Sequence, residues 1–210
     1  KHFVAVTDPN TSLQDLAYRK GFRKVFNARP DVGGRFSVFT HFGLVPAALM
    51  GIDLRKFLGQ GIASDLQSQK KVPYPVNPNL MLGLVLAEAA KRGKDKLTFI
   101  AEGFAGSLVP WLEQLIAESS GKEGKGILPI ENEPVLVGKT YPADRVFVYF
   151  KTDGSQARMA EAQKASGHVV ITIAISEPYG LAKEFYRWEY ATAIACAVLK
   201  VNAFDQPNVQ

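Results

Sequence analysis

The stretch LTFIAEGFAGSLVPWLEQLIAESSGKEGKGILPI, residues 97–130, decides the fold. It starts with a short apolar run at 97–101, continues through a helical pattern over 107–119 that stops at Gly121, and ends in a second apolar run at 126–130. Short runs rich in Val, Ile and Phe are typical of buried strands. Two such strands with a helix of this length between them indicate a βαβ unit with parallel strands.

The same alternation extends along the rest of the chain. Paired end signals support the helices: Thr11 or Ser12 precedes one, and Asn77 with Pro78 precedes another that stops at Gly93. We therefore expect an α/β fold, a parallel sheet flanked by helices on both faces. The further strands are predicted at 2–7, 24–27, 146–150 and 168–175, and the further helices at 11–20, 44–50, 54–67, 80–92, 155–165 and 180–201.

Composition excludes several classes of protein. A net charge of +5 suits an anionic small molecule, but the basic residues are scattered, which argues against a nucleic-acid partner. No apolar run reaches the ~18 residues of a membrane span, so a membrane partner is not expected. The single cysteine, Cys196, lies in an apolar helical segment and is predicted to be a buried thiol, which fits a reducing cytoplasm.

Three polar motifs interrupt the apolar pattern. In the first, VGGRFS at 32–37, paired glycines allow a sharp turn and a close approach to a ligand at Gly34, and Arg35 presents a fork of donors to an oxyanion. An ordinary turn with a solvated arginine is the alternative. In the third, NAFDQP at 202–207, the amide of Gln206 is a candidate ligand contact, with a surface amide as the alternative.

The second motif, QLIAESSGK at 114–122, carries a candidate general base. Glu118 follows Gln114 by one helical turn, so both side chains share a face. A carboxylate at a helix C-terminus faces the negative end of the helix dipole, which disfavours its ionised form and favours proton uptake. A residue that merely caps the helix end is the alternative. The histidines have no metal-ligand spacing, and we expect no metal site.

The order and spacing of these three motifs resemble the C-terminal half of the phosphoglucose isomerase family. The sequences of Thr7-Asp8-Pro9 and of residues 204–209 are most similar to the isomerase part of bifunctional transaldolase/phosphoglucose isomerase fusions. The resemblance implies sugar-isomerase (SIS) domains, three-layer sandwiches with a parallel sheet. Residues 1–70 are expected to be the C-terminal part of a first SIS domain plus a helical connection, and residues 71–210 the second SIS domain; the polar, proline-rich stretch 67–78 is the candidate boundary.

The resemblance also implies an activity, the interconversion of glucose 6-phosphate and fructose 6-phosphate. Glu118 would move a proton between C2 and C1, and Arg35 would stabilise the enediolate. Gln114, Gln206 and Gly34 would contact the substrate. No metal or organic cofactor is implied. The implied partners are a phosphorylated hexose and the rest of a longer chain, with an upstream phosphate loop and, in the fusions, a transaldolase domain; a homo-oligomer is left open.

The chain departs from the family pattern in several places. Ser120 replaces an asparagine, and residues 137–150 lack the histidine that opens the sugar ring. The phosphate loop would precede Lys1, and an active-site lysine would follow Gln210. We therefore expect the fragment alone to be inactive and its parent to open the ring with another group. Two alternatives are a SIS-type domain that binds a sugar phosphate without converting it, and an assembly piece of a multidomain protein.

Overall fold

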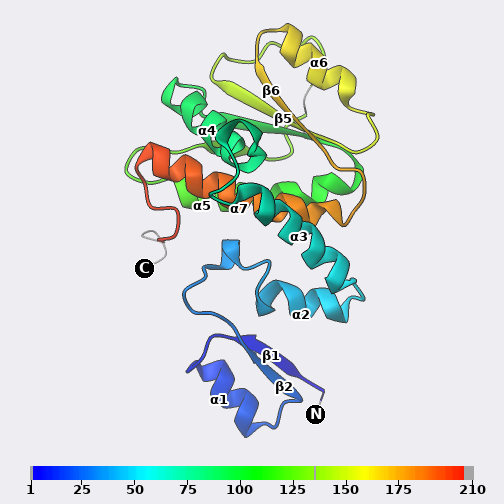
Figure 1. Ribbon diagram of the computed structural model, residues 1–210, viewed down its shortest axis with the longest axis vertical. Coiled ribbons are helices and arrows are strands. Elements are labelled where there is room, and N and C mark those ends of the chain that lie inside the picture. The colour runs from blue at the N-terminus through cyan, green and yellow to red at the C-terminus, as the bar shows by residue number, and fades with distance from the viewer. Residues whose placement is uncertain (1, 135, 206–210) are drawn as a thin grey trace. The chain divides into compact units, whose positions relative to one another are not determined.

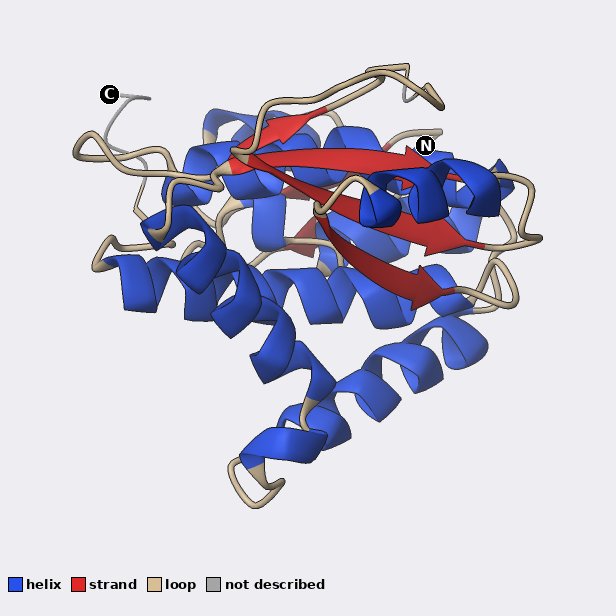
Figure 2. Cartoon of the chain, turned by 90° about the horizontal axis from the view of Figure 1, so that it is seen from above, coloured by secondary structure: helices blue, strands red, loops and turns tan. Residues whose placement is uncertain are grey.

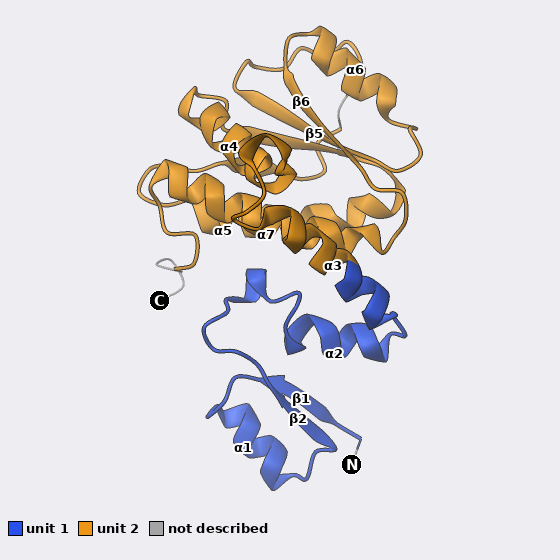
Figure 3. Ribbon diagram, in the orientation of Figure 1, with its two compact units in different colours: residues 1–59 blue, residues 60–210 orange. Residues whose placement is uncertain are grey.

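The computed structural model describes residues 2–134 and 136–205 (Figure 1). They form two compact units, residues 1–59 and residues 60–210 (Figure 3). The division falls within α3 (Leu54–Ser68), because the C-terminal half of that helix is bonded to the second unit. Asn79 donates to the carbonyl and hydroxyl oxygens of Ser64 at 3.1 and 3.0 Å. The assignment of residues 1–70 and 71–210 to two SIS domains stays a prediction.

The first unit starts with a βαβ element, as the sequence predicts. Strands β1 (Val4–Thr7) and β2 (Lys24–Asn27) pair in parallel around α1 (Ser12–Arg19). Thr11 caps this helix, since its hydroxyl accepts the Gln14 amide hydrogen at 3.3 Å. The rest of the unit consists of a 3₁₀ turn η1 (Gly34–Phe36), α2 (His41–Leu49) and the first part of α3.

The second unit contains a four-stranded parallel sheet in the order β4-β3-β5-β6 (Figure 2). Every strand predicted here forms, within one or two residues of its expected ends. The additional elements are short 3₁₀ turns, which apolar periodicity does not reveal. The unit comprises η2 (Tyr74–Val76), α4 (Pro78–Lys91), β3 (Lys96–Ala101), η3 (Gly103–Leu108), α5 (Val109–Ser120), β4 (Leu128–Ile130), β5 (Arg145–Lys151), α6 (Ala157–Ala165), β6 (Val169–Ala174) and α7 (Gly180–Leu199).

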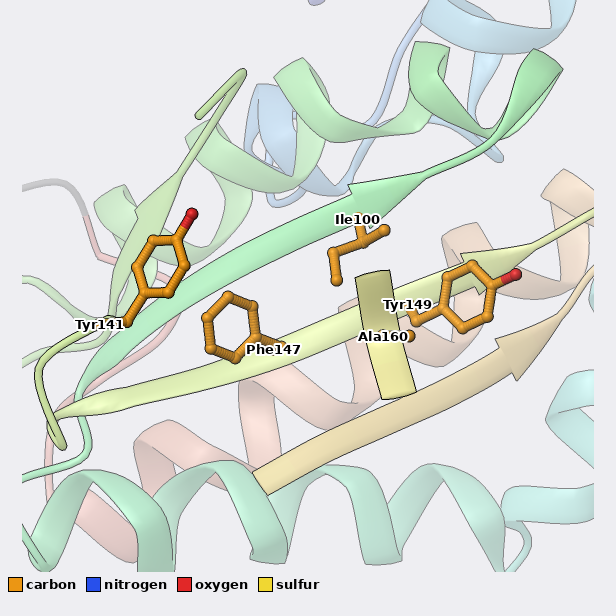
Figure 4. Close-up of a cluster of buried hydrophobic side chains, with 5 residues drawn as sticks. All are labelled: Ile100, Tyr141, Phe147, Tyr149 and Ala160. Carbon is orange, nitrogen blue, oxygen red and sulfur yellow. The ribbon is translucent and has the colours of Figure 1, made fainter. Parts of the chain in front are cut away.

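Helices cover both faces of this sheet. On one face Phe147 and Tyr149 of β5 pack with Ala160 of α6 (Figure 4). On the other face the rings of Phe99 and Phe150 lie 6.1 and 6.0 Å from the ring of Trp188 on α7, against which α4 and α5 pack. Successive side chains of a strand point to opposite faces of the sheet, so β5 is buried on both of its faces. The predicted fold class, a parallel sheet between two helical layers, is confirmed.

The carboxylate of Glu102 is buried at the carboxyl end of the sheet. Glu102 follows β3 and is 2% exposed. It accepts backbone hydrogen bonds from Thr152, Asp153 and Gly154 at 2.7, 2.9 and 2.8 Å, from Gln156 at 2.7 Å, and a further bond from the Tyr149 hydroxyl. Burial alone would raise the pKa of Glu102, but these hydrogen bonds outweigh it and hold the pKa well below its usual range. The carboxylate therefore fixes the loop between β5 and α6.

We expect Glu102→Gln to lower the free energy of unfolding at neutral pH by about 3 kcal/mol, because the new amide hydrogens face backbone N–H groups. The folded pKa is depressed, so the stabilisation is present above the unfolded pKa and is lost as pH falls below it. The difference between variant and wild type should therefore shrink in acid. Urea unfolding followed by the fluorescence of Trp111 and Trp188, both in the second unit, measures it.

The matched control for this prediction is Glu88→Gln, at an exposed carboxylate that bonds Lys91 at 2.8 Å. Exposed ion pairs contribute little to stability, so this variant should unfold like the wild type. A Glu102→Gln protein with unchanged unfolding at neutral pH, or with a deficit that grows in acid, would contradict the account.

Candidate active site

Glu118 and Gln114 lie side by side on α5. The Gln114 amide donates to a Glu118 carboxylate oxygen at 3.1 Å, and both side chains are exposed. The opposite face of α5 is buried through Leu112, Leu115 and Ile116, which fix the rotation of the helix. The shared face predicted from their spacing is therefore present. Their catalytic and binding roles stay predictions.

The end of α5 is fixed immediately after Glu118. The Ser120 hydroxyl donates to the Ile116 carbonyl at 2.7 Å and accepts the Ile127 amide hydrogen at 2.9 Å. A Cβ on Gly121 would lie 2.7 Å from the Ala117 carbonyl oxygen, so only glycine fits there. The helix stops before Gly121 as predicted, although this glycine has a φ of −75° and does not use the left-handed region. Ser120 thus has a structural task in this chain.

Lys122 joins this helix end to the C-terminal segment. Its side chain is 6% exposed, and its ammonium donates to the carbonyls of Asn202 and Asp205 at 2.5 and 2.8 Å. It also contacts the Asp205 carboxylate at 2.5 Å. Sequence reasoning gave Lys122 no role, because a lysine in a loop after a helix is normally solvated. The sequence did contain one indication of a role, since Lys122 is the last residue of the second motif, 114–122.

Gly34 and Arg35 form a 3₁₀ turn in the first unit. Arg35 is 2% exposed, and its Cζ lies 5.4 Å from the centre of the Phe36 ring. The alternative of a solvated arginine in an ordinary turn is therefore wrong. A Cβ on Gly34 would meet nothing within 4 Å, and the backbone there has no positive φ, so neither packing nor conformation requires glycine.

The remaining candidate residues divide as follows. Gln206 lies outside the described residues. Arg35 with Gly34 belongs to the first unit, and Glu118 with Gln114 belongs to the second. Within residues 2–134 and 136–205, no cluster of three or more His, Cys, Asp or Glu side chains has the geometry to hold a metal ion. Cys196 is buried as predicted.

No protein-family model matches the chain. The whole chain is 30% identical, over 261 aligned positions, to glucose-6-phosphate isomerase from Parabacteroides distasonis. It is also 30% identical over its whole length to that of Heliobacterium modesticaldum; in both cases it spans 56% of the relative. The alignment exceeds the chain's 210 residues, so the relatives carry segments that this chain lacks.

Two crystal structures share the fold over 99% of the chain. A hypothetical protein from Thermus thermophilus superimposes with a TM-score of 0.84 at 24% identity, and the match covers 60% of that protein. A glucose-6-phosphate isomerase from Chlamydia trachomatis superimposes with a TM-score of 0.75 at 17% identity, over 50% of its length.

The chain therefore has an α/β fold with a parallel sheet, and both crystal structures share it. The predicted resemblance of the chain to the phosphoglucose isomerase family is confirmed by relatives that match it from end to end. The chain spans little more than half the length of these relatives. Across the described parts of the chain, none of the helices has the length and apolar character that crossing a bilayer demands.

We expect Ser120→Ala to lower the free energy of unfolding by about 1–2 kcal/mol, because it leaves the buried Ile127 amide without its acceptor. Ser107→Ala is the matched control, since that serine also bonds a backbone carbonyl at 2.7 Å but is exposed. Urea denaturation of the two variants measures the difference. Equal stabilities would show that the hydroxyl of Ser120 does not hold the helix end.

Proposed function

We propose that the natural protein containing this chain interconverts glucose 6-phosphate and fructose 6-phosphate. The observation that carries the proposal is the exposed carboxylate of Glu118, held by Gln114 on a helix with a fixed end, in a chain related throughout to glucose-6-phosphate isomerases. Because the chain spans only 56% of these relatives, the reaction belongs to the whole protein.

Glu118 is the proposed base. Its carboxylate takes the proton from C2 of the open-chain aldose, and the electrons of the C2–H bond form a C1–C2 double bond. The C1 carbonyl oxygen then carries the negative charge of an enediolate. The proton of the C2 hydroxyl passes to the oxygen on C1, Glu118 returns its proton to carbon C1, and the oxygen on C2 becomes the ketone, so no oxidant or reductant is needed. The hydrogen bond from Gln114 restrains the carboxylate during these transfers.

Arg35 is the proposed electrostatic partner of the enediolate. A guanidinium that is 2% exposed is already ordered before the charge develops, which is the condition for effective stabilisation. Gly34 leaves the backbone beside Arg35 open to a substrate, since no described atom lies within 4 Å of where a side chain would begin. Gln206 supplies a further amide contact in this proposal.

The other parts of the proposal follow the family resemblance. Residues 1–70 complete a first SIS domain, residues 71–210 form the second, and no metal or organic cofactor takes part. A group other than a histidine in residues 137–150 opens the ring. The transaldolase fusion, the homo-oligomer and the cytoplasmic location stay predictions.

Glu118→Gln in the natural protein should lower kcat at least ~10³-fold, because the amide cannot accept the C2 proton, while substrate binding is retained. Glu113→Gln, on the same helix, is the matched control and should keep wild-type kcat. A coupled assay from either sugar phosphate measures turnover, and calorimetry measures binding. Binding without turnover in the wild type would instead support a SIS-type domain that only senses a sugar phosphate.

Arg35→Lys should lower kcat by about 10²-fold, because lysine keeps the charge but loses the fixed fork of donors. Arg29→Lys is the matched control, since Arg29 is an exposed arginine that pairs only locally with Asp31 at 2.7 Å. Steady-state kinetics with both sugar phosphates measure the two variants. A normal kcat with a raised KM would assign Arg35 to substrate binding and not to the enediolate.

A further inference from the structure

The groups that donate hydrogen bonds to Glu102 form a cradle for an oxyanion. Three successive backbone N–H groups, those of residues 152–154, point to one carboxylate oxygen at 2.7, 2.9 and 2.8 Å. The Gln156 N–H, at 2.7 Å, and the Tyr149 hydroxyl donate to the other oxygen. These donors, from residues 149, 152–154 and 156, make up the oxyanion cradle.

The oxyanion cradle offers more donors than a carboxylate can use well. Each carboxylate oxygen has about two lone pairs, so three N–H groups crowd one of the oxygens. A tetrahedral anion such as phosphate would distribute the same donors over more oxygen atoms. Gly154 has a φ of +86°, in the left-handed region found in turns whose successive N–H groups bind anions. The backbone of the loop is therefore shaped for an oxyanion.

The cradle lies where open parallel sheets usually bind their ligands. The sheet order is β4-β3-β5-β6, so the connection after β3 leads through α5 to one side and the connection after β5 leads through α6 to the other. Ligands of α/β proteins bind at the carboxyl ends of neighbouring strands whose connections diverge in this way. Glu102 follows β3 and the loop 152–156 follows β5, so the carboxylate occupies this position. The loop also leads into the N-terminus of α6, where the helix dipole favours a negative charge.

We propose that Glu102 is the built-in occupant of an oxyanion site and excludes phosphate-type anions from this end of the sheet. The carboxylate and a phosphate compete directly, because both need the same donors. The inference goes beyond the proposed function, since the cradle has the same geometry whether or not Glu118 transfers a proton. With this site filled, the phosphate group of a hexose phosphate has to bind elsewhere in the natural protein.

The test is urea unfolding of the natural protein in inorganic phosphate and in chloride, at equal pH and ionic strength. Glu102→Ala removes the carboxylate and leaves the donors of the cradle unsatisfied, so it should be less stable than the wild type in chloride. Phosphate should restore its stability by binding the folded state. The ratio of folded to unfolded protein should rise about ten-fold at a phosphate concentration about ten times the dissociation constant.

Three further proteins give the response expected without an open cradle, because phosphate stabilises any folded protein by its exclusion from the surface. The wild type keeps its carboxylate. Glu102→Gln fills the cradle with an uncharged amide. Asn79→Ala removes buried hydrogen bonds to Ser64 and Ser68 elsewhere in the second unit, so it lowers stability without opening the cradle. Phosphate should stabilise Glu102→Ala more than any of the three.

An equal gain from phosphate in all four proteins would overturn the proposal. A crystal structure of Glu102→Ala in phosphate should show the ion bonded to the N–H groups of residues 152–154, and an ion bound only elsewhere would also overturn it. If Glu102→Ala is unfolded in chloride, phosphate should recover the folded protein. If it is unfolded in both salts, Glu102→Ser, whose hydroxyl can hold a water molecule against the donors, takes its place in the same comparison.

Discussion

The burial of β5 on both faces is the constraint on which the second unit depends. Its alternate side chains meet α6 on one side, through Phe147 and Tyr149, and Trp188 of α7 on the other, through Phe150. A strand buried in this way needs helices on both faces. Two of these helices are also crossovers between parallel strands: α5 joins β3 to β4, and α6 joins β5 to β6. The orientation of α5 follows, because that helix packs against α7 with its apolar side and turns Gln114 and Glu118 outward.

Much of the fold was predictable because its signals are local. The apolar runs located every strand of the described chain, and Asn77 with Pro78 marked the start of α4, where the Asn77 side chain accepts the Leu80 amide hydrogen at 2.9 Å. Helical spacing also placed Glu118 beside Gln114 correctly. Such features depend on residues a few positions apart, so the sequence displays them directly.

The features that were missed are charged groups buried by distant partners. Glu102 is satisfied by a loop about fifty residues later, and Lys122 by a segment about eighty residues later, so neither neighbourhood reveals the contact. Residue type favoured a solvated side chain at both positions. The burial of Arg35 escaped the same reasoning. These charged groups hold loops in place. The spacing of apolar residues predicts helices and strands, and it says least about the structure of loops.

The environments of the carboxylates in the second unit support the choice of Glu118 as base. Glu102 is saturated with hydrogen bonds that hold its pKa low, so it has no tendency to take up a proton. Burial raises the pKa of Glu189 to about 8, so at neutral pH it is largely protonated already. Glu184 is buried and forms an ion pair with Arg187 at 3.3 Å, so its carboxylate already has a charged partner. Glu118 is exposed at the end of a rigid helix, where a carboxylate can meet a sugar carbon.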